Sequence, residues 1–278
     1  MSHVANGLEG SMTTRRFQVD FADVGPLDLT VADYGGGRPV LLLHGGGGPD
    51  TVGKFAELFA STRPVRVIVP THPGFGGTPR PEGLHTIYGL AALYVALLDQ
   101  LDLADVTVIG NSIGGWIAAE IGLLASPRVT RVIVVDAVGI QVPRHPIADF
   151  FELTMDQVVQ LSFHNPSAFR TDHSSLPLAG QAIVAGNRAA LATYAGTAMY
   201  DPSLMQRLSQ MGTPTWVLWG ESDRIVDSDY GRAFAAAIPK AHFALLPATG
   251  HLPQVETPDS FLRAILDCVD ADSPSSHR

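Results

Sequence analysis

The sequence has almost no cysteine, since Cys268 is the only one among its 278 residues. A single thiol cannot close an internal disulfide and has no partners for a zinc cluster, which excludes disulfide-rich and cysteine–metal proteins. Long apolar runs are also missing, because the longest stretch, 87–98, is well short of the roughly 20 residues that a membrane-spanning helix needs. The first residues lack the basic start and apolar core of a signal peptide. We therefore expect a cytoplasmic protein that does not act at a membrane.

Positive charge is scarce as well. The chain has 18 Lys and Arg residues against 27 Asp and Glu residues, which gives a formal net charge of −9. Nucleic acids and anionic membranes are bound through Lys and Arg side chains that release phosphate counterions, so this balance argues against both as partners. The expected partner is a small-molecule ligand, and the sequence leaves open whether the protein is a monomer or a homodimer.

Metal and cofactor motifs are incomplete. The stretch 48–54 approaches a phosphate-binding loop, but Phe55 stands where a Mg²⁺-binding Ser or Thr is required. Five histidines lack the spacing of metal ligands on one helix face, and we expect them on the surface or in an inserted segment: His72, His85, His145, His164 and His173. We therefore expect neither a metal nor an organic cofactor.

What the sequence does contain is an alternation of short, continuous apolar runs with helical patterns. Runs of this kind are typical of parallel strands that are covered on both faces. We expect strands at 17–21, 27–34, 40–43, 65–69, 106–109, 132–135, 216–219 and 243–246, and helices at 51–61, 86–101, 113–125, 228–238 and 258–269. This order predicts an α/β fold with a doubly wound, mostly parallel sheet.

One interval breaks the alternation. Between residues 136 and 213 there are helical patches at 147–161 and 180–199 but no buried strand. An insertion at the carboxyl end of a strand lies where open α/β sheets bind ligands. We therefore expect a helical cap at 140–207, inserted after the sixth strand.

The rest of the chain is predicted to form one core, which the insertion divides into 15–139 and 208–272. Residues 1–14 are mostly small and polar, and we expect a disordered leader or a remnant of cloning there. We expect a disordered tail at 273–278. The sequence thus predicts one α/β core with a cap.

The motif Gly110-Asn111-Ser112-Ile113-Gly114-Gly115 lies between a predicted strand and a predicted helix. In that context G-x-S-x-G predicts a nucleophilic serine on a sharp turn. The glycines leave room for a strained backbone, and the helix N-terminus favours developing negative charge. Ser112 is therefore the candidate nucleophile, and the alternative is a glycine-rich turn without chemistry.

A serine hydroxyl is a weak nucleophile, so it needs a base that a third group orients. His251 follows Gly250 just after the last predicted strand, where it can face the serine turn. The rival His242 lies at the start of the same strand, which places it at the opposite end of the sheet. His251 is therefore the candidate base.

The candidate acid lies in the loop after the strand 216–219. Asp223 is within that loop, whereas Asp227 and Asp229 fall where the next helix begins and are explained by helix capping. Glu221 comes directly off the strand. Asp136 ends another strand at the same edge of the sheet and is kept as a backup acid.

The stretch His44-Gly45-Gly46-Gly47-Gly48 follows the strand 40–43, where the loop that binds an oxyanion is expected in this arrangement. Glycines let the backbone turn its N–H groups toward a developing negative charge without a side-chain clash. We expect the N–H groups of Gly46 and Ile113 to be the two donors.

These motifs resemble those of the α/β-hydrolases with a serine nucleophile. The resemblance covers the chain from about residue 15, and the order Ser112, Asp223, His251 is the order of that superfamily. The glycine-rich loop and Gly-Asn-Ser-x-Gly-Gly are most similar to the meta-cleavage-product hydrolases, which cut C–C bonds in vinylogous diketone acids, and to related esterases. The resemblance implies that Asn111 and Arg188 hold polar groups of the substrate.

One residue departs from that group. Leu252 follows His251 where the meta-cleavage-product hydrolases usually have Trp, and we expect it in the substrate site. The first hypothesis is therefore a serine hydrolase that cleaves a carboxylic ester of a small to medium apolar substrate through an acyl-enzyme. The alternative is a C–C bond hydrolase, and a third hypothesis is a ligand-binding protein of the same fold with little turnover.

Overall fold

The computed structural model describes residues 12–21, 25–170 and 175–270, which contain one eight-stranded sheet. The strands are β1 (Thr13–Phe21), β2 (Gly25–Gly35), β3 (Arg38–Leu43), β4 (Val65–Pro70), β5 (Val106–Asn111), β6 (Val129–Val135), β7 (Thr215–Gly220) and β8 (His242–Leu246). Their order in the sheet is β1-β2-β4-β3-β5-β6-β7-β8. The β1–β2 and β2–β4 pairs are antiparallel and the others are parallel, which confirms the predicted α/β fold.

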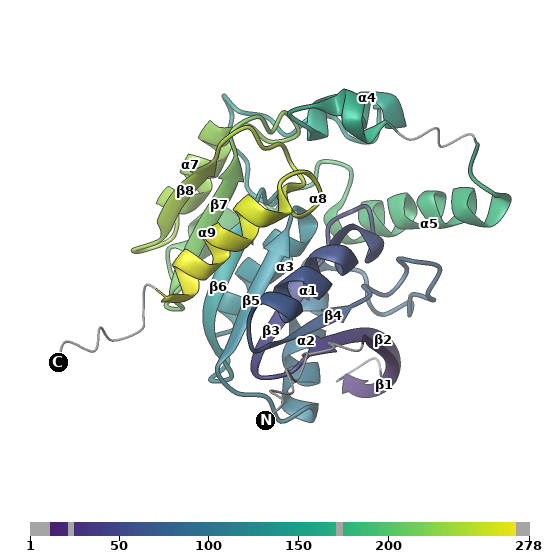
Figure 1. Ribbon diagram of the computed structural model, residues 1–278, viewed down its shortest axis with the longest axis vertical. Helices are drawn as coiled ribbons and strands as arrows, with labels where there is room; N and C mark the ends of the chain where they lie inside the picture. Colours follow the sequence, from purple (N-terminus) through teal and green to yellow (C-terminus); the bar gives the residue numbers. More distant parts are fainter. Residues whose placement is uncertain (1–11, 22–24, 171–174, 271–278) are drawn as a thin grey trace, which may run out of the picture.

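Helices cover both faces of this sheet (Figure 1). One face carries α1 (Asp50–Thr62), α8 (Pro253–Glu256) and α9 (Pro258–Asp270), and the other carries α2 (Ile87–Gln100), α3 (Ile113–Leu123) and α7 (Ser228–Ala236). All six residues of β5 are buried, as expected for a central parallel strand between two helical layers. Phe55 and Phe261 pack on the first face, and Tyr94 and Ile117 pack on the second.

The segment between β6 and β7 is helical. It contains α4 (Met155–Ser162), the 3₁₀ helix η2 (Pro166–Phe169), α5 (Leu178–Ala195) and α6 (Leu204–Leu208). The helix predicted at 147–161 begins only at Met155, so the prediction was wrong for the first half of that range. The carbonyls of Phe150, Phe151 and Leu153 accept hydrogen bonds from Arg188 of α5, and the Thr154–Gln157 capping box starts α4 after them.

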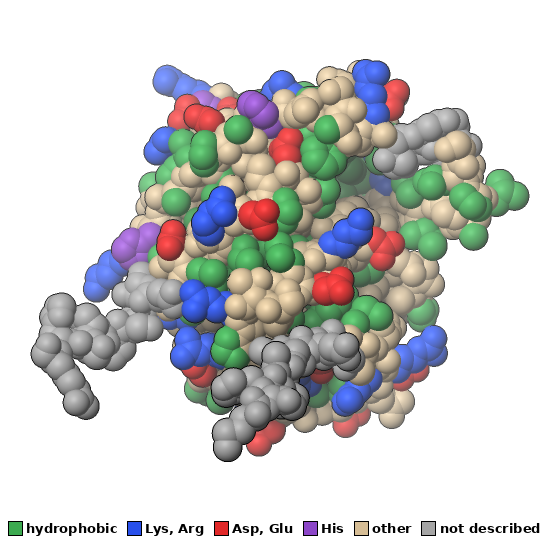
Figure 2. All heavy atoms as spheres, in the orientation of Figure 1, with side chains coloured by type: hydrophobic (Ala, Val, Ile, Leu, Met, Phe, Trp, Pro, Cys, Tyr) green, Lys and Arg blue, Asp and Glu red, His purple; other side chains and the backbone are tan. Residues whose placement is uncertain are grey.

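The helix α5 has two unlike halves. Its C-terminal half packs on the core through Leu191 and Tyr194, whereas Leu178 at its start is 84% exposed. Figure 1 shows this end projecting away from the sheet, and Figure 2 shows hydrophobic side chains gathered there. The predicted range 180–199 is shifted by a few residues, because Gly196 takes a positive φ of 67° and ends the helix.

The ends of the chain differ slightly from the expectation. β1 begins at Thr13, inside the range 1–14 expected as a leader, because Thr13 pairs with Asp33 of β2. Residues 1–11 of that leader and the expected tail 273–278 lie outside the described residues. In the described part of the chain, no helix combines the length and apolar character needed to cross a membrane.

A buried ion pair joins the segment after α5 to the central helix α3. Glu120 of α3, whose side chain is 3% exposed, accepts hydrogen bonds from Arg207 of α6 at 2.6 and 2.7 Å. Arg207 also binds Asp201 at 2.7 Å. The pair fixes α6 behind the helix that follows the serine turn.

Replacement of Arg207 by Ala is expected to lower the free energy of unfolding by about 3 kcal/mol, because it leaves the Glu120 carboxylate buried without a counter-charge. Urea unfolding measures this change. Arg232→Ala is the matched control, since Arg232 faces Asp229 at 3.6 Å on the surface and its loss should cost less than about 1 kcal/mol. Equal effects of the two substitutions would contradict the assignment.

Candidate active site

Ser112 lies on a strained turn between β5 and α3. Its backbone has φ 58° and ψ −121°, a conformation that L-residues seldom adopt. A Cβ added at Gly110 would lie 2.0 Å from the carbonyl oxygen of Gly114, and one added at Gly114 would lie 2.4 Å from that of Leu43. Glycine is therefore required on both sides of the serine, as the motif predicts.

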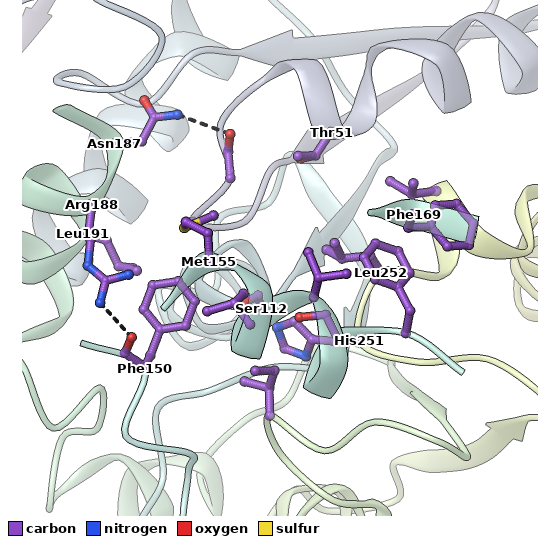
Figure 3. A pocket seen from close by; sticks show the side chains of 18 of the residues that line it. Thr51, Ser112, Phe150, Met155, Phe169, Asn187, Arg188, Leu191, His251 and Leu252 are labelled. Atoms are coloured by element: carbon purple, nitrogen blue, oxygen red, sulfur yellow. Dashed lines mark hydrogen bonds between the residues drawn. The ribbon is translucent and has the colours of Figure 1, made fainter. Parts of the chain in front are cut away.

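The imidazole of His251 is oriented by Asp223. His251 Nδ1 lies 2.7 Å from Asp223 Oδ2, and the two side chains are 8% and 0% exposed. The other carboxylate oxygen, Oδ1, accepts the N–H groups of Ile225 at 2.8 Å and Val226 at 3.1 Å. Because Nδ1 is occupied by Asp223, Nε2 is the ring nitrogen left for another partner, and Ser112 lies next to the ring in Figure 3.

The other histidine and acids weighed in the sequence lie elsewhere. His242 is exposed and stacks on Trp216 at a centroid distance of 5.3 Å, at the start of β8. Asp227 caps α7 by accepting two backbone N–H groups. Asp136 accepts the N–H of Gly220 at 2.7 Å through Oδ1 and makes no bond to the imidazole.

Asn111 has a different place from the one expected. Its side chain is 3% exposed and lies outside the residues that line the pocket. The amide donates to the carbonyl of His251 at 2.8 Å and accepts from Gln254 at 3.1 Å. The predicted contact between Asn111 and the substrate is therefore corrected: the residue before the serine holds the histidine loop.

Glu256 is a site residue that the sequence analysis missed. Its carboxylate accepts three backbone N–H groups: Gly250 at 2.7 Å, His164 at 3.1 Å and Asn165 at 2.9 Å. The N–H of His251 itself donates to the carbonyl of Ser162 at 2.7 Å. These bonds join the histidine loop to the end of α4. The sequence signal was only a carboxylate five residues after the candidate base.

The glycine loop after β3 forms another wall of the site. Gly46 and Gly47 line the pocket, and Ile113 is the first residue of α3. Asn187 of α5 donates to the carbonyl of Gly47 at 3.1 Å and accepts the N–H of Gly76 at 2.8 Å. The side chain of Asn187 therefore fixes the loop that is expected to supply an oxyanion donor.

Two buried histidines hold the start of that loop. The backbone N–H of His72 donates to His44 Nε2 at 3.1 Å, so His44 carries its hydrogen on Nδ1, which faces the carbonyl of Gly45 at 2.8 Å. His72 Nε2 faces the carbonyl of His44 at 2.9 Å, so its Nδ1 accepts from Tyr94. The prediction that His72 lies on the surface or in the insertion was wrong, because its side chain is buried in this network.

Burial lowers the pKa of His44 to about 4. Burial, and next the neighbouring His44, also lower the pKa of His72 well below its ordinary value. Both imidazoles are therefore neutral in the folded protein at neutral pH.

A cavity of about 520 Å³ opens beside Ser112 and His251. Its wall is mainly apolar, with side chains that include Val138, Phe150, Met155, Phe163, Leu191 and Ile225. Leu252 lines it as expected (Figure 3). Among the described residues of this wall, Arg170 and Arg188 are the ones with a formal charge, and no carboxylate faces them.

Arg188 lies in the pocket wall, held from one side. Its Nη2 donates to the carbonyls of Phe150, Phe151 and Leu153 at 2.8, 2.7 and 3.2 Å. The guanidinium carbon lies 5.0 and 5.5 Å from the ring centroids of Phe150 and Phe151. A guanidinium has five N–H donors, and among the described residues no acceptor is bound to Nε or Nη1, which can therefore donate to a bound molecule.

We expect Gly110→Ala to disrupt the serine turn, because the new Cβ would meet the Gly114 carbonyl. Overpacking of this kind costs about 1–3 kcal/mol or more. Urea unfolding gives the loss of stability, and labelling with a fluorophosphonate, which reacts with activated serines, should fall with it. Gly186→Ala is the control, because a Cβ there meets nothing within 4 Å and Ala favours the helix α5. Wild-type labelling of Gly110→Ala would contradict the steric argument.

We also expect the protein to lose stability as the pH falls from about 6.5 to about 4. In this range the unfolded state binds protons on His44 and His72, whose pKa there is about 6.5, while the buried imidazoles stay neutral. Unfolding midpoints measured against pH test this. His72→Gln removes one of the two groups, so it should have a smaller loss over that range than the wild type, and an identical loss would contradict the assignment.

Comparison with known proteins agrees with this geometry. Residues 40–264 match the model of the family described as the alpha/beta hydrolase family. The 2-hydroxy-6-oxo-2,4-heptadienoate hydrolase of Pseudomonas putida is 27% identical, over 89% of this chain and 95% of the relative. The 2-hydroxy-6-oxo-6-phenylhexa-2,4-dienoate hydrolase of Burkholderia cepacia is 26% identical, over 94% of this chain and 97% of the relative.

Solved structures share the fold. A thermophilic esterase from Thermogutta terrifontis superposes with a TM-score of 0.73 at 25% identity, covering 93% of this chain and 98% of that one. A meta-cleavage product hydrolase from Pseudomonas fluorescens gives a TM-score of 0.75 at 20% identity, with the same coverage of the two chains. The match over most of the chain, together with the sheet and the serine turn, shows that this protein belongs to the alpha/beta hydrolase family and is a hydrolase.

Proposed function

We propose that the protein hydrolyses a C–C bond next to a ketone in a vinylogous diketone acid. The observation that carries this proposal is Arg188, one of two cations in the wall of a mainly apolar pocket beside Ser112, with N–H groups that bind no acceptor among the described residues. Such a wall suits a substrate with an apolar body and one carboxylate. The names of the relatives from Pseudomonas putida and Burkholderia cepacia describe dienoate hydrolases, which supports the same class. C–C hydrolysis is thus placed before ester hydrolysis, whereas the expectation drawn from Leu252 put ester hydrolysis first.

The proposed roles follow the geometry of the site. Ser112 attacks the ketone carbon while His251 takes its proton through Nε2. Asp223 holds the imidazole in the required tautomer and stabilises its charged form. The N–H groups of Gly46 and Ile113 receive the oxyanion, and removal of such a donor typically costs roughly 10²–10³ in turnover.

The C–C bond then breaks in the tetrahedral intermediate. Its electron pair passes into the conjugated 2-oxo acid, which delocalises the charge and takes up the proton that His251 removed from Ser112. The acyl group stays on Ser112 until water, activated by His251, releases it as a carboxylic acid. One water is consumed overall: its hydroxyl joins the acyl fragment and its hydrogen joins the other fragment.

The segment 140–207 is proposed as the cap over this site. Residues of α4 and α5, among them Met155, Val159, Arg188 and Leu191, line the same pocket as Ser112. Figure 1 shows both helices beyond one end of the sheet. A cap in this place excludes water while the charged intermediate exists.

Ester hydrolysis is the second candidate, and Leu252 favours it. A leucine in the wall adds apolar surface that an acyl chain or a small alcohol can contact. The esterase from Thermogutta terrifontis, at 25% identity, has the same fold. Both reactions use the same acyl-enzyme, so they differ in the leaving group.

We expect the protein to consume 2-hydroxy-6-oxo-2,4-heptadienoate, which is measured as loss of its visible absorbance. Ser112→Ala should abolish the reaction. Arg188→Gln keeps an amide N–H donor facing the carbonyls that precede α4, but it removes the positive charge. The value of kcat/KM for the acid should therefore fall roughly 10- to 100-fold. Turnover of a neutral p-nitrophenyl ester should change little. Good ester turnover with no loss of the dienoate would replace the first candidate by the second.

A further inference from the structure

Two buried carboxyl groups lie together behind the imidazole of His251. Asp136 is 0% exposed and Asp223 is 3% exposed. Asp136 directly follows β6 and Asp223 lies in the loop after β7, which are neighbours in the sheet. Two carboxyl groups in contact inside a protein cannot both be ionised without a large cost, so one of them holds a proton.

The surroundings decide which carboxyl is charged. Asp223 accepts the N–H groups of Ile225 and Val226 on one oxygen and the imidazole N–H of His251 on the other. Asp136 accepts one backbone N–H from the described residues, that of Gly220. Hydrogen bonds to a carboxylate favour its ionised form, so the charge belongs on Asp223 and the proton on Asp136.

The second oxygen of Asp136 points to the same conclusion. Oδ2 is buried, and within the described part of the chain no N–H or O–H group donates to it. The group in hydrogen-bond contact with this carboxyl is Asp223, which brings no hydrogen when it is ionised. Buried polar atoms are nearly always paired. A proton on Asp136 turns this contact of two acceptors into a hydrogen bond.

We propose that Asp136 is a positioning residue that stays protonated at neutral pH and donates a hydrogen bond to the Asp223 carboxylate. It holds that carboxylate in the position that binds His251. The inference rests on the proposed roles of Ser112, His251 and Asp223. It assigns a fourth side chain to that machinery.

The electrostatics of the site agree. Burial, and next the negative charge of Asp223, raise the pKa of Asp136 well above its ordinary value of 3.8. The titratable group that acts on it is Asp223, while the hydroxyl of Tyr230 from α7 is bound to the backbone of Ile140. The backbone of Asp136 takes a φ of 44°, which Asp tolerates better than most residues with a Cβ.

Loss of this proton would limit activity at alkaline pH. Two negative charges would then repel each other, and Asp223 would lose the donor that holds it in place, so the imidazole of His251 would lose its orientation. The rate should therefore fall as the pH rises through the pKa of Asp136.

The first test is the rate of fluorophosphonate labelling of Ser112 against pH. Asp136→Asn supplies an amide N–H in place of the O–H, so it should label at the wild-type rate at neutral pH and lose the alkaline limit. Asp136→Ala should label roughly 10- to 100-fold more slowly. Asp229→Asn, the same substitution at an exposed position of α7, should leave the profile unchanged. An Asp136→Asn variant as slow as Asp136→Ala, or one with the wild-type alkaline limit, would overturn the proposal.

The second test needs no substrate. The folded protein keeps a proton on Asp136 that the unfolded chain loses above about pH 4, so this residue makes the wild type less stable as the pH rises. The unfolding midpoint of Asp136→Asn, relative to that of the wild type, should therefore increase from pH 5 to pH 8. The infrared band of a protonated carboxyl at neutral pH should also be missing from Asp136→Asn.

A constant difference in midpoint, or no such band in the wild type, would overturn the assignment. Failure to cleave a dienoate would change neither the unfolding midpoints nor the infrared band, so the proposal for Asp136 and the proposed function can fail separately. Both measurements use only the wild type and Asp136→Asn, so they remain possible if Asp136→Ala does not fold.

Discussion

The site depends on one steric constraint: no Cβ atom can stand on either side of the serine turn. At Gly110 and Gly114 the neighbouring carbonyls are so close that β5 and α3 meet with only backbone between them. This close approach keeps Ser112 in its positive-φ conformation at the carboxyl edge of the sheet. The loops after β3, β7 and β8 start at the same edge, because the carboxyl ends of parallel strands all lie there.

That geometry explains why much of the site could be predicted. Ser112, Asp223 and His251 each follow a short apolar run, and the direction of parallel strands brings such positions together whatever their separation along the chain. The residue types then narrow the choice. For the same reason His242, at the start of its strand, could be set aside from the sequence alone.

The residues that support the site could not be predicted in this way. Asn111 reaches the carbonyl of His251 and Glu256 reaches His164, and both contacts depend on how distant loops pack. The buried pair of His44 and His72 depends on two separate loops in the same manner. The start of α4 was missed because the carbonyls before it are taken up by Arg188, a residue more than 30 positions later. Periodicity describes a segment by itself and has no information on such partners.

The walls of the pocket are attached to the core in unlike ways. The end of α4 is hydrogen-bonded to the loop of His251 through Ser162 and Glu256, whereas α5 carries the charged side chain Arg188 and begins in solvent. A substitution near the end of α4 therefore risks moving His251, the proposed base, whereas one at the exposed start of α5 does not. Divergence toward new substrates can thus proceed along α5 while the reaction machinery is inherited unchanged.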